Sequence, residues 1–284
     1  PLMLPEPATV ARHQFDIPGN ALVFVTSADA FTSPARKNTF AVIDAFEQAF
    51  PSAPDVRLVI KLNIPSNAVH IRGALVNAMR ERAAANPRIL LIAETLPYPE
   101  VLGLYAACDV FVSLHRAEGL GMGPMEAMAL GKPVIATAWS GNMTYMNHGN
   151  SCPVSYKLIR PPKGAPKEFS PGFLRKKTIW AEPSITEAAH YMRLLHENPT
   201  LRGSLGKRAA ADLAQFIADA CDARFIDGLR LLLLANAADD EHKAGKQAAQ
   251  QRMKKSLRAS PGMLWLKANQ LLDKHVWWRI PGLK

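Results

Sequence analysis

The feature that most constrains the fold is the stretch from residue 109 to residue 137, in which two apolar runs flank a glycine-rich loop. Residues 109–113 (DVFVS) and 134–137 (VIAT) are short, apolar and rich in β-branched side chains, which is typical of buried strands. Helix formers occupy residues 125–130, and a glycine follows them. The order strand, loop, helix, strand predicts one unit of a parallel α/β sheet.

Two acids, Glu118 and Glu126, bracket the loop with seven residues between them. We expect the helix to begin at Pro124, because proline suits a first helical position that needs no amide donor. The free amides and positive dipole of such a helix start attract phosphate. At the third helical position Glu126 could also stabilise the helix start, whereas Glu118 would repel an anion and therefore needs a functional reason. The predicted anion site is formed by backbone amides of Gly119, Leu120, Gly121 and Met122.

Apolar runs and amphipathic segments alternate along the rest of the chain. Strands are predicted at residues 21–26, 56–61, 88–92 and 152–155, and helices at residues 35–50, 69–85, 99–108, 185–196, 201–218 and 222–237. The proline-rich, basic residues 157–180 are predicted to form a surface loop, and residues 141–146 a short turn or helix. This alternation predicts an α/β fold with a doubly wound parallel sheet, in which ligands bind at the carboxyl ends of the strands.

The two acids in this setting, followed by the sequence EAMALGKPVIAT, resemble the Glu-x7-Glu signature of retaining glycosyltransferases with the GT-B fold, in the large family four (group 1). The resemblance covers about residues 21–192. It implies that residues 21–237 form the Rossmann-like, C-terminal domain that binds the sugar-nucleotide donor. Residues 1–20 would then be a linker from a missing N-terminal domain, and residues 238–284 a basic, Trp-containing helical tail.

The resemblance also implies roles for both acids and for a basic pair. Glu118 would be the catalytic residue beneath the donor sugar. Glu126 would accept hydrogen bonds from the ribose, since a carboxylate can accept from two hydroxyls. In the family a basic pair in the region after the first strand clamps the donor diphosphate, and Arg36 and Lys37 match it. The strand before them lacks the Gly-Arg pair of the commonest family pattern, so we expect Arg36 or Lys37, with Lys37 preferred, to supply both contacts. Preorganised charge of this kind is usually the largest catalytic term.

Four further residues are candidate donor contacts: Ser27, Leu96, His115 and Asn142. Leu96 ends the segment 93–96, where the family selects its base largely through backbone contacts. On residue chemistry alone, His115 is more often a hydrogen-bonded loop histidine, and Asn142 is as often part of a simple turn. The sequence contains no DxD-type ligand set between strands, so we expect neither a metal nor another cofactor.

Composition limits the possible partners. The net charge is +10, but ten of the 34 Lys and Arg residues lie within residues 241–284, where only Glu241 and Asp273 oppose them. The body is therefore nearly neutral, which argues against a nucleic-acid partner. The tail also carries three tryptophans, so it is either a solvated basic helix that packs against the missing domain or a contact with an anionic membrane surface.

The expected partners are a nucleotide-diphosphate sugar and a glycan or lipid-linked acceptor. Three widely spaced cysteines favour a reducing compartment, so we expect a cytoplasmic protein, with a peripheral position at the inner face of the membrane as the alternative. The longest purely apolar run, residues 231–235, is too short to span a membrane.

Two other functions fit the same pattern. One is a non-catalytic module that binds a nucleotide sugar, and the other is a GT-B-like sugar-nucleotide epimerase. A dinucleotide-binding dehydrogenase is disfavoured, because Ser-Ala-Asp-Ala follows the first strand in place of a Gly-x-Gly-x-x-Gly turn.

Overall fold

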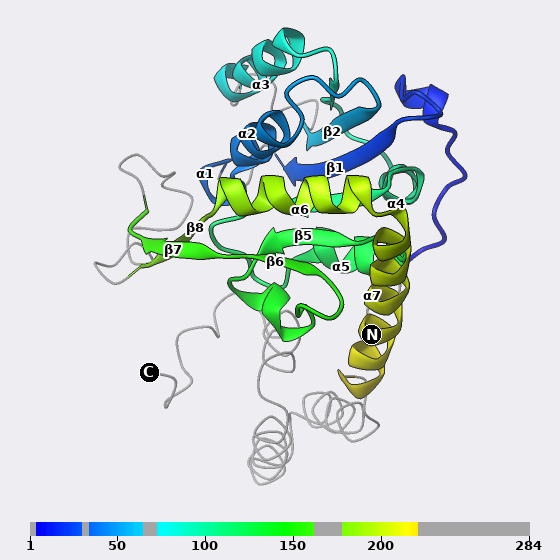
Figure 1. Cartoon of the computed structure of the whole chain (residues 1–284), viewed down its shortest axis with the longest axis vertical. Helices are drawn as coiled ribbons and strands as arrows, with labels where there is room; N and C mark the ends of the chain where they lie inside the picture. The colour runs from blue at the N-terminus through cyan, green and yellow to red at the C-terminus, as the bar shows by residue number, and fades with distance from the viewer. Residues whose placement is uncertain (1–3, 30–33, 65–72, 162–177, 221–284) are drawn as a thin grey trace, which may run out of the picture. The chain divides into compact units, whose positions relative to one another are not determined.

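Six parallel strands form one sheet in the order β3-β2-β1-β4-β5-β6, which confirms the predicted doubly wound α/β fold. The computed structural model describes residues 4–29, 34–64, 73–161 and 178–220 (Figure 1). The strands are β1 (Leu22–Asp29), β2 (Val56–Asn63), β3 (Ile89–Ile92), β4 (Val110–Ser113), β5 (Val134–Thr137) and β6 (Cys152–Val154). The strand order reverses between β1 and β4, and ligands of such sheets bind at the carboxyl ends of the strands where the order reverses.

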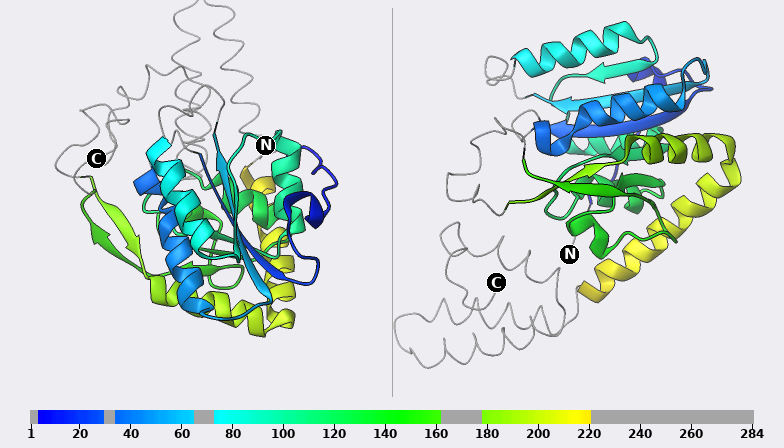
Figure 2. Two further views of the ribbon diagram at one scale, coloured as in Figure 1. Left: turned by 90° about the horizontal axis from the view of Figure 1, so that it is seen from above. Right: turned by 60° about the vertical axis from the view of Figure 1, so that its left-hand side comes forward.

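Helices cover both faces of the sheet (Figure 2). They are α1 (Pro34–Lys37), α2 (Thr39–Ala49), α3 (Gly73–Ala85), α4 (Tyr98–Ala107), α5 (Met122–Ala129), α6 (Ile185–Glu197) and α7 (Pro199–Ala220), with two 3-10 turns, η1 (Arg12–Phe15) and η3 (Gly141–Thr144). Helices α2 and α3 lie on one side of the sheet and α4 and α5 on the other (Figure 2). The predicted third C-terminal helix, residues 222–237, and the tail 238–284 lie outside the described residues.

The predicted single helix at residues 35–50 is interrupted. Asn38 adopts a left-handed conformation (φ 55°) and separates α1 from α2. Its buried side-chain amide donates to the Leu114 carbonyl at 2.9 Å, which attaches α1 to the end of β4. Asparagine tolerates this conformation better than most residues, and the hydrogen bond offsets part of its cost.

The core lies between the sheet and helices α2 and α6. Phe24 on β1 meets Phe46 edge-on at a centroid distance of 6.4 Å and Phe50 in a tilted geometry at 5.5 Å, arrangements that aromatic rings prefer. Met192 and Leu195 of α6 pack into the same buried cluster. The rigid sheet that results carries the strand ends on which the site is built.

Part of the predicted surface loop at residues 157–180 is regular structure instead. Strands β7 (Tyr156–Ile159) and β8 (Trp180–Pro183) pair as an antiparallel ribbon separate from the main sheet. The sequence analysis missed these strands because each has only four residues and the segment between them is rich in proline and basic residues. Residues 162–177 of the predicted loop lie outside the described residues.

Residues 4–20 are held against the body. The Arg12 guanidinium donates to the Ala107 carbonyl at 2.8 Å and to the Asp109 carboxylate at 2.9 Å. The Ala8 amide donates to the Pro99 carbonyl at 2.9 Å, and a Cβ at Gly103 would lie only 2.4 Å from the Ala8 oxygen. The predicted boundaries of the linker, domain and tail stay predictions.

Backbone contacts divide the chain into one compact unit, Leu4–Leu213, and a second made of Pro1–Met3 and Ala214–Lys284. Of the second unit the structure describes only the last residues of α7. Among the described helices none has the length and apolarity needed to cross a bilayer.

Candidate functional site

The glycine-rich loop ends at Gly121, which directly precedes α5. Gly121 is the N-cap with φ 79°, a left-handed conformation that favours glycine, and its carbonyl accepts from the Met125 amide at 3.0 Å. The helix therefore begins at Met122, and the prediction that it begins at Pro124 is wrong. Proline is still accommodated, because the amides of the first helical turn have no partner within the helix.

This earlier start changes the position of Glu126. The residue lies in the second turn of α5, beyond the helix-capping position that the sequence analysis left open. Its side chain is instead buried, with 7% of the residue exposed, and its Oε1 accepts a hydrogen bond from the Tyr98 hydroxyl at 2.8 Å. Burial raises the pKa of Glu126, while the bond from Tyr98 opposes the rise.

Glu118 forms a compact charged cluster with the two predicted cations. Lys37 Nζ lies 2.5 Å from Glu118 Oε2, and Arg36 Nη1 lies 3.3 Å from Oε1. Only 12% of the Glu118 side chain is exposed. Burial alone would raise the pKa of this carboxyl, but the charges of Lys37 and Arg36 prevail and its pKa lies below the usual value. Residues 81 positions apart thus meet, one in α1 after β1 and the other in the loop that follows β4.

Arg116, which the sequence analysis did not single out, holds α1 beside this cluster. Its guanidinium makes a two-pronged ion pair with Glu182 of β8, at 2.5 and 2.8 Å, and also donates to the Ala35 carbonyl at 2.7 Å. Its backbone amide donates to the Arg36 carbonyl at 2.8 Å. Because α1 has only one turn, these contacts replace helix packing as the support of the two cations. A basic residue directly after His115 was the only sequence signal for this role.

His115 and Asn142 lie in a buried network between the loops that follow β4 and β5. The two nitrogens of the His115 ring lie 3.0 Å from Ser113 Oγ and 3.0 Å from the Trp139 carbonyl, and Nε2 is 3.2 Å from Asn142 Oδ1. The Asn142 amide donates to the Thr137 carbonyl at 2.9 Å. Burial lowers the pKa of His115, which favours a neutral ring. This network braces the loops, and a donor contact from either residue stays a prediction.

The two loops also touch through their backbones. Gly141 approaches Gly119 so closely that a Cβ at Gly141 would lie 1.6 Å from the Gly119 carbonyl oxygen. Tyr145 closes the other side, with its hydroxyl 2.7 Å from the Gly121 carbonyl and 3.0 Å from that of Leu120. The path of the glycine-rich loop is therefore set by the segment that follows β5.

The remaining candidates lie at the ends of β1 and β3. Ser27 Oγ accepts from the buried Tyr105 hydroxyl at 2.5 Å, and Leu96 is half-buried. Lys61 of β2, another residue that the sequence analysis missed, is 3% exposed and donates to the Glu94 carbonyl at 2.6 Å. Burial lowers the pKa of Lys61. A lysine within an otherwise apolar strand was the available signal, and it anchors the segment in which base selection is expected.

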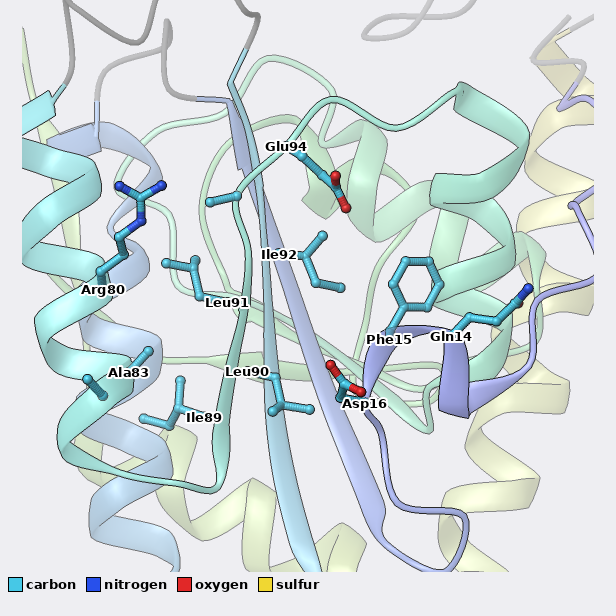
Figure 3. Close-up of a pocket in the computed structure, with 12 residues that line it drawn as sticks. Gln14, Phe15, Asp16, Arg80, Ala83, Ile89, Leu90, Leu91, Ile92 and Glu94 are labelled. Carbon is cyan, nitrogen blue, oxygen red and sulfur yellow. The ribbon is translucent and has the colours of Figure 1, made fainter.

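A groove of about 620 Å³ runs along β3, the outer strand of the sheet, between η1 and α3 (Figure 3). Phe15 and Ile92 lie on one side of the strand, and Arg80 and Leu91 lie on the other. Glu118, Glu126 and the two cations do not line it. The groove is therefore separate from the charged cluster.

Taken together, the site is a set of complementary groups at the reversal of the strand order. We call Arg36, Lys37, Glu118 and Glu126 the strand-end cluster. Its two cations and the amino end of α5 are suited to bind phosphate, and its two acids are suited to bind hydroxyl groups. Within the described part of the chain no three His, Cys, Asp or Glu side chains are grouped so that they could hold a metal, and the expectation that no cofactor is needed stays untested.

Comparison with solved structures supports the fold. The chain is similar to the C-terminal domain of a glycosyl transferase group 1 family protein (LpcC) from Francisella tularensis, with 19% identity, a TM-score of 0.51, and coverage of 74% of this chain and 94% of that one. It is also similar to sucrose-phosphate synthase from Thermosynechococcus elongatus (19%, TM-score 0.58, 82% and 50%). A third similar structure is HepE from Anabaena in complex with UDP and glucose (21%, TM-score 0.51, 72% and 46%). At these identities the likeness concerns the fold alone.

Sequence comparison extends from fold to family. A lipopolysaccharide core biosynthesis mannosyltransferase, LpsB of Rhizobium meliloti (strain 1021), is 33% identical over 105 residues, which are 36% of this chain and 28% of that protein. The matched region thus spans less than a third of that relative. The profile of the family described as glycosyl transferases group 1 matches residues 32–212. Because this match includes most of the chain and the whole strand-end cluster, the protein belongs to the group 1 glycosyl transferases.

Proposed function

We propose that this chain binds the donor of a retaining glycosyltransferase, which transfers a sugar from a nucleotide diphosphate to a glycan or lipid-linked acceptor. The observation that carries the proposal is the cluster of Arg36, Lys37 and Glu118 at the reversal of the strand order. Two similar proteins support it: LpsB is a mannosyltransferase of lipopolysaccharide core biosynthesis, and HepE was solved in complex with UDP and glucose. A cytoplasmic location, with the basic tail at an anionic membrane surface, is part of the same proposal.

Donor binding requires the charged cluster to rearrange its pairing. In the structure both cations are paired with Glu118, whose single negative charge offsets one of their two positive charges. A donor diphosphate carries about two negative charges, which compete with Glu118 for the same cations. Glu118 can then accept hydrogen bonds from the sugar. Arg36 and Lys37 then stabilise the charge that develops on the leaving diphosphate, in a partly buried setting where such charges interact more strongly than in water.

In the proposed transfer step these groups act on the donor, and the acceptor supplies the attacking hydroxyl. The bond between the anomeric carbon and the diphosphate oxygen breaks, and a bond to the acceptor oxygen forms on the same face. The proton of the acceptor hydroxyl passes to the departing phosphate oxygen. Glu118 stabilises positive charge at the anomeric carbon, and Glu126 holds the ribose.

The decisive experiment compares wild type with Glu118→Gln in calorimetric titrations with UDP, GDP and ADP. The substitution removes the negative charge that competes with the diphosphate for both cations, so the diphosphate alone should bind more tightly, by up to about tenfold for 1.4 kcal/mol. Turnover of the corresponding sugar nucleotide with acceptor should fall by about 100-fold or more. Glu187→Gln on α6 is the matched control and should change neither quantity.

Other outcomes identify the alternatives. A binding module would lose little function in Glu118→Gln, whereas an epimerase would convert its donor without any acceptor, which product analysis detects. If no nucleoside diphosphate binds to wild type at millimolar concentration, the proposal is wrong.

A further inference from the structure

Tyr98 makes a hydrogen bond to the side chain of Glu126, and the sequence analysis did not single it out. It is the first residue of α4, and its hydroxyl donates to Glu126 Oε1 at 2.8 Å. The residue is 41% exposed, whereas Glu126 is 7% exposed. An exposed tyrosine rarely needs a buried partner, because water can satisfy its hydroxyl equally well. The buried acid therefore has more to gain from this bond than the tyrosine.

The place of Tyr98 in the chain connects two parts of the expected donor site. It directly follows residues 93–97, which join β3 to α4. The buried Lys61 holds the start of that segment through the Glu94 carbonyl, at 2.6 Å. The hydrogen bond of Tyr98 therefore ties the segment after β3 to α5, which carries the acid.

We propose that Tyr98 is a positioning residue for the ribose: its hydroxyl holds Oε1 of Glu126, so that Oε2 is presented to the ribose hydroxyls of the nucleotide. This inference rests on the proposed function, in which Glu126 binds the ribose. A carboxylate with one oxygen fixed keeps a defined plane, and the second oxygen can then accept from a vicinal diol without first losing rotational freedom.

The electrostatic setting supports this role. Burial raises the pKa of Glu126, and the bond from Tyr98 favours the ionised form. The other titratable groups that act on or near Glu126 are Lys37, whose charge also favours ionisation, and the hydroxyls of Tyr105 and Tyr145. Tyr98 therefore keeps the acid in the form that accepts two hydrogen bonds.

The test measures discrimination between ribose and deoxyribose. UDP, GDP and ADP are each titrated beside their 2′,3′-dideoxy counterparts, and the base that binds most tightly is used. Tyr98→Phe should weaken the ribonucleotide about tenfold, the loss expected for one hydrogen bond to a charged group, and leave the dideoxynucleotide unchanged. The ratio of the two affinities should therefore fall by the same factor. In addition, the pH below which ribonucleotide affinity declines should be higher in Tyr98→Phe than in wild type.

Two further variants make the result specific. Tyr191→Phe removes another tyrosine hydroxyl that is hydrogen-bonded to a glutamate, Glu187 on α6, and should leave both affinities unchanged. Glu126→Gln should abolish most of the discrimination, and adding Tyr98→Phe to it should cost little more, since both changes act on one contact.

The failures of the two proposals are distinguishable. If wild type binds no nucleoside diphosphate, the proposed function fails. If wild type discriminates by the ribose hydroxyls and Tyr98→Phe discriminates equally well, only the role of Tyr98 is overturned. A loss of affinity for both nucleotides in equal measure would overturn it as well, because that pattern indicates a general structural role.

Discussion

Gly141→Ala is the substitution for which the structure predicts the largest local displacement. The new Cβ would lie 1.6 Å from the Gly119 carbonyl oxygen, 2.7 Å from its carbon and 3.1 Å from the Leu120 Cα. A carbon–oxygen contact needs roughly 3.4 Å, so the two loops must separate by about 1.8 Å. The opposing atoms belong to the backbone, and no side-chain rotation can relieve the overlap.

The displaced segment is the glycine-rich loop between Glu118 and α5, so the effect should fall on the donor. A misplacement of about 1 Å in a binding or catalytic group can cost about 100-fold in rate. We therefore expect Gly141→Ala to lose at least about 100-fold in turnover. The free energy of unfolding should fall by about 1–3 kcal/mol, the usual cost of overpacking. Calorimetric titration with the best-binding nucleoside diphosphate should show weaker binding.

Gly203→Ala is the matched control. A Cβ at Gly203 meets nothing within 4 Å, and the residue lies inside α7, where alanine favours the helix by about 1 kcal/mol. This variant should keep wild-type binding and unfold at an equal or higher temperature. If Gly141→Ala bound the donor like wild type, the inferred contact between the two loops would not control the site.

Three further predictions test other parts of the argument. In Arg116→Lys the ammonium group cannot reproduce the two-pronged ion pair with Glu182, so donor affinity measured by calorimetry should fall about tenfold. In Glu182→Gln the loss of affinity should be smaller, because an amide oxygen can still accept a hydrogen bond. Gly103→Ala should lower the free energy of unfolding by about 1–3 kcal/mol in denaturant titrations, with binding unchanged, if the N-terminal segment packs as described. Because the folded pKa of Glu118 is lowered, its contribution to stability is present above the ordinary range near about 4.3 and is lost as pH falls through the folded value. The difference in unfolding free energy between wild type and Glu118→Gln should therefore shrink on acidification, and a constant difference would contradict the ion pairing.

The sequence was most informative where periodicity and position in the sheet act together. The strand at residues 134–137 was predicted to the residue, and the placement of Lys37 and Glu118 after different strands was enough to expect both at one edge of the sheet. Their direct contact was not predicted, because the diphosphate was expected to be the partner of Lys37. In the structure the two opposite charges pair with each other, so neither is buried without a partner.

The errors have local physical causes. The helix start at Met122 depends on the left-handed conformation of Gly121, and a sequence with several loop glycines does not reveal which of them caps the helix. The break at Asn38 depends on a hydrogen bond to a carbonyl 76 positions away, which no local pattern encodes. The ribbon β7–β8 is paired across a long connection, whereas hairpin signals in sequence are short-range.

The two acids of the strand-end cluster have different environments, which move their pKa values in opposite directions. Glu118 is buried, but the cations paired with it hold its pKa below the usual value, which suits the proposed response to charge in the reacting sugar. Glu126 is buried, its pKa is raised by that burial, and the hydrogen bond from Tyr98 and the charge of Lys37 oppose the rise. A pair of titratable groups with pKa values moved apart by their surroundings is typical of sites in which each group has its own role. The spacing of the two acids alone could not distinguish them, because the distinction arises from residues of α1 and α4 that only the fold brings to them.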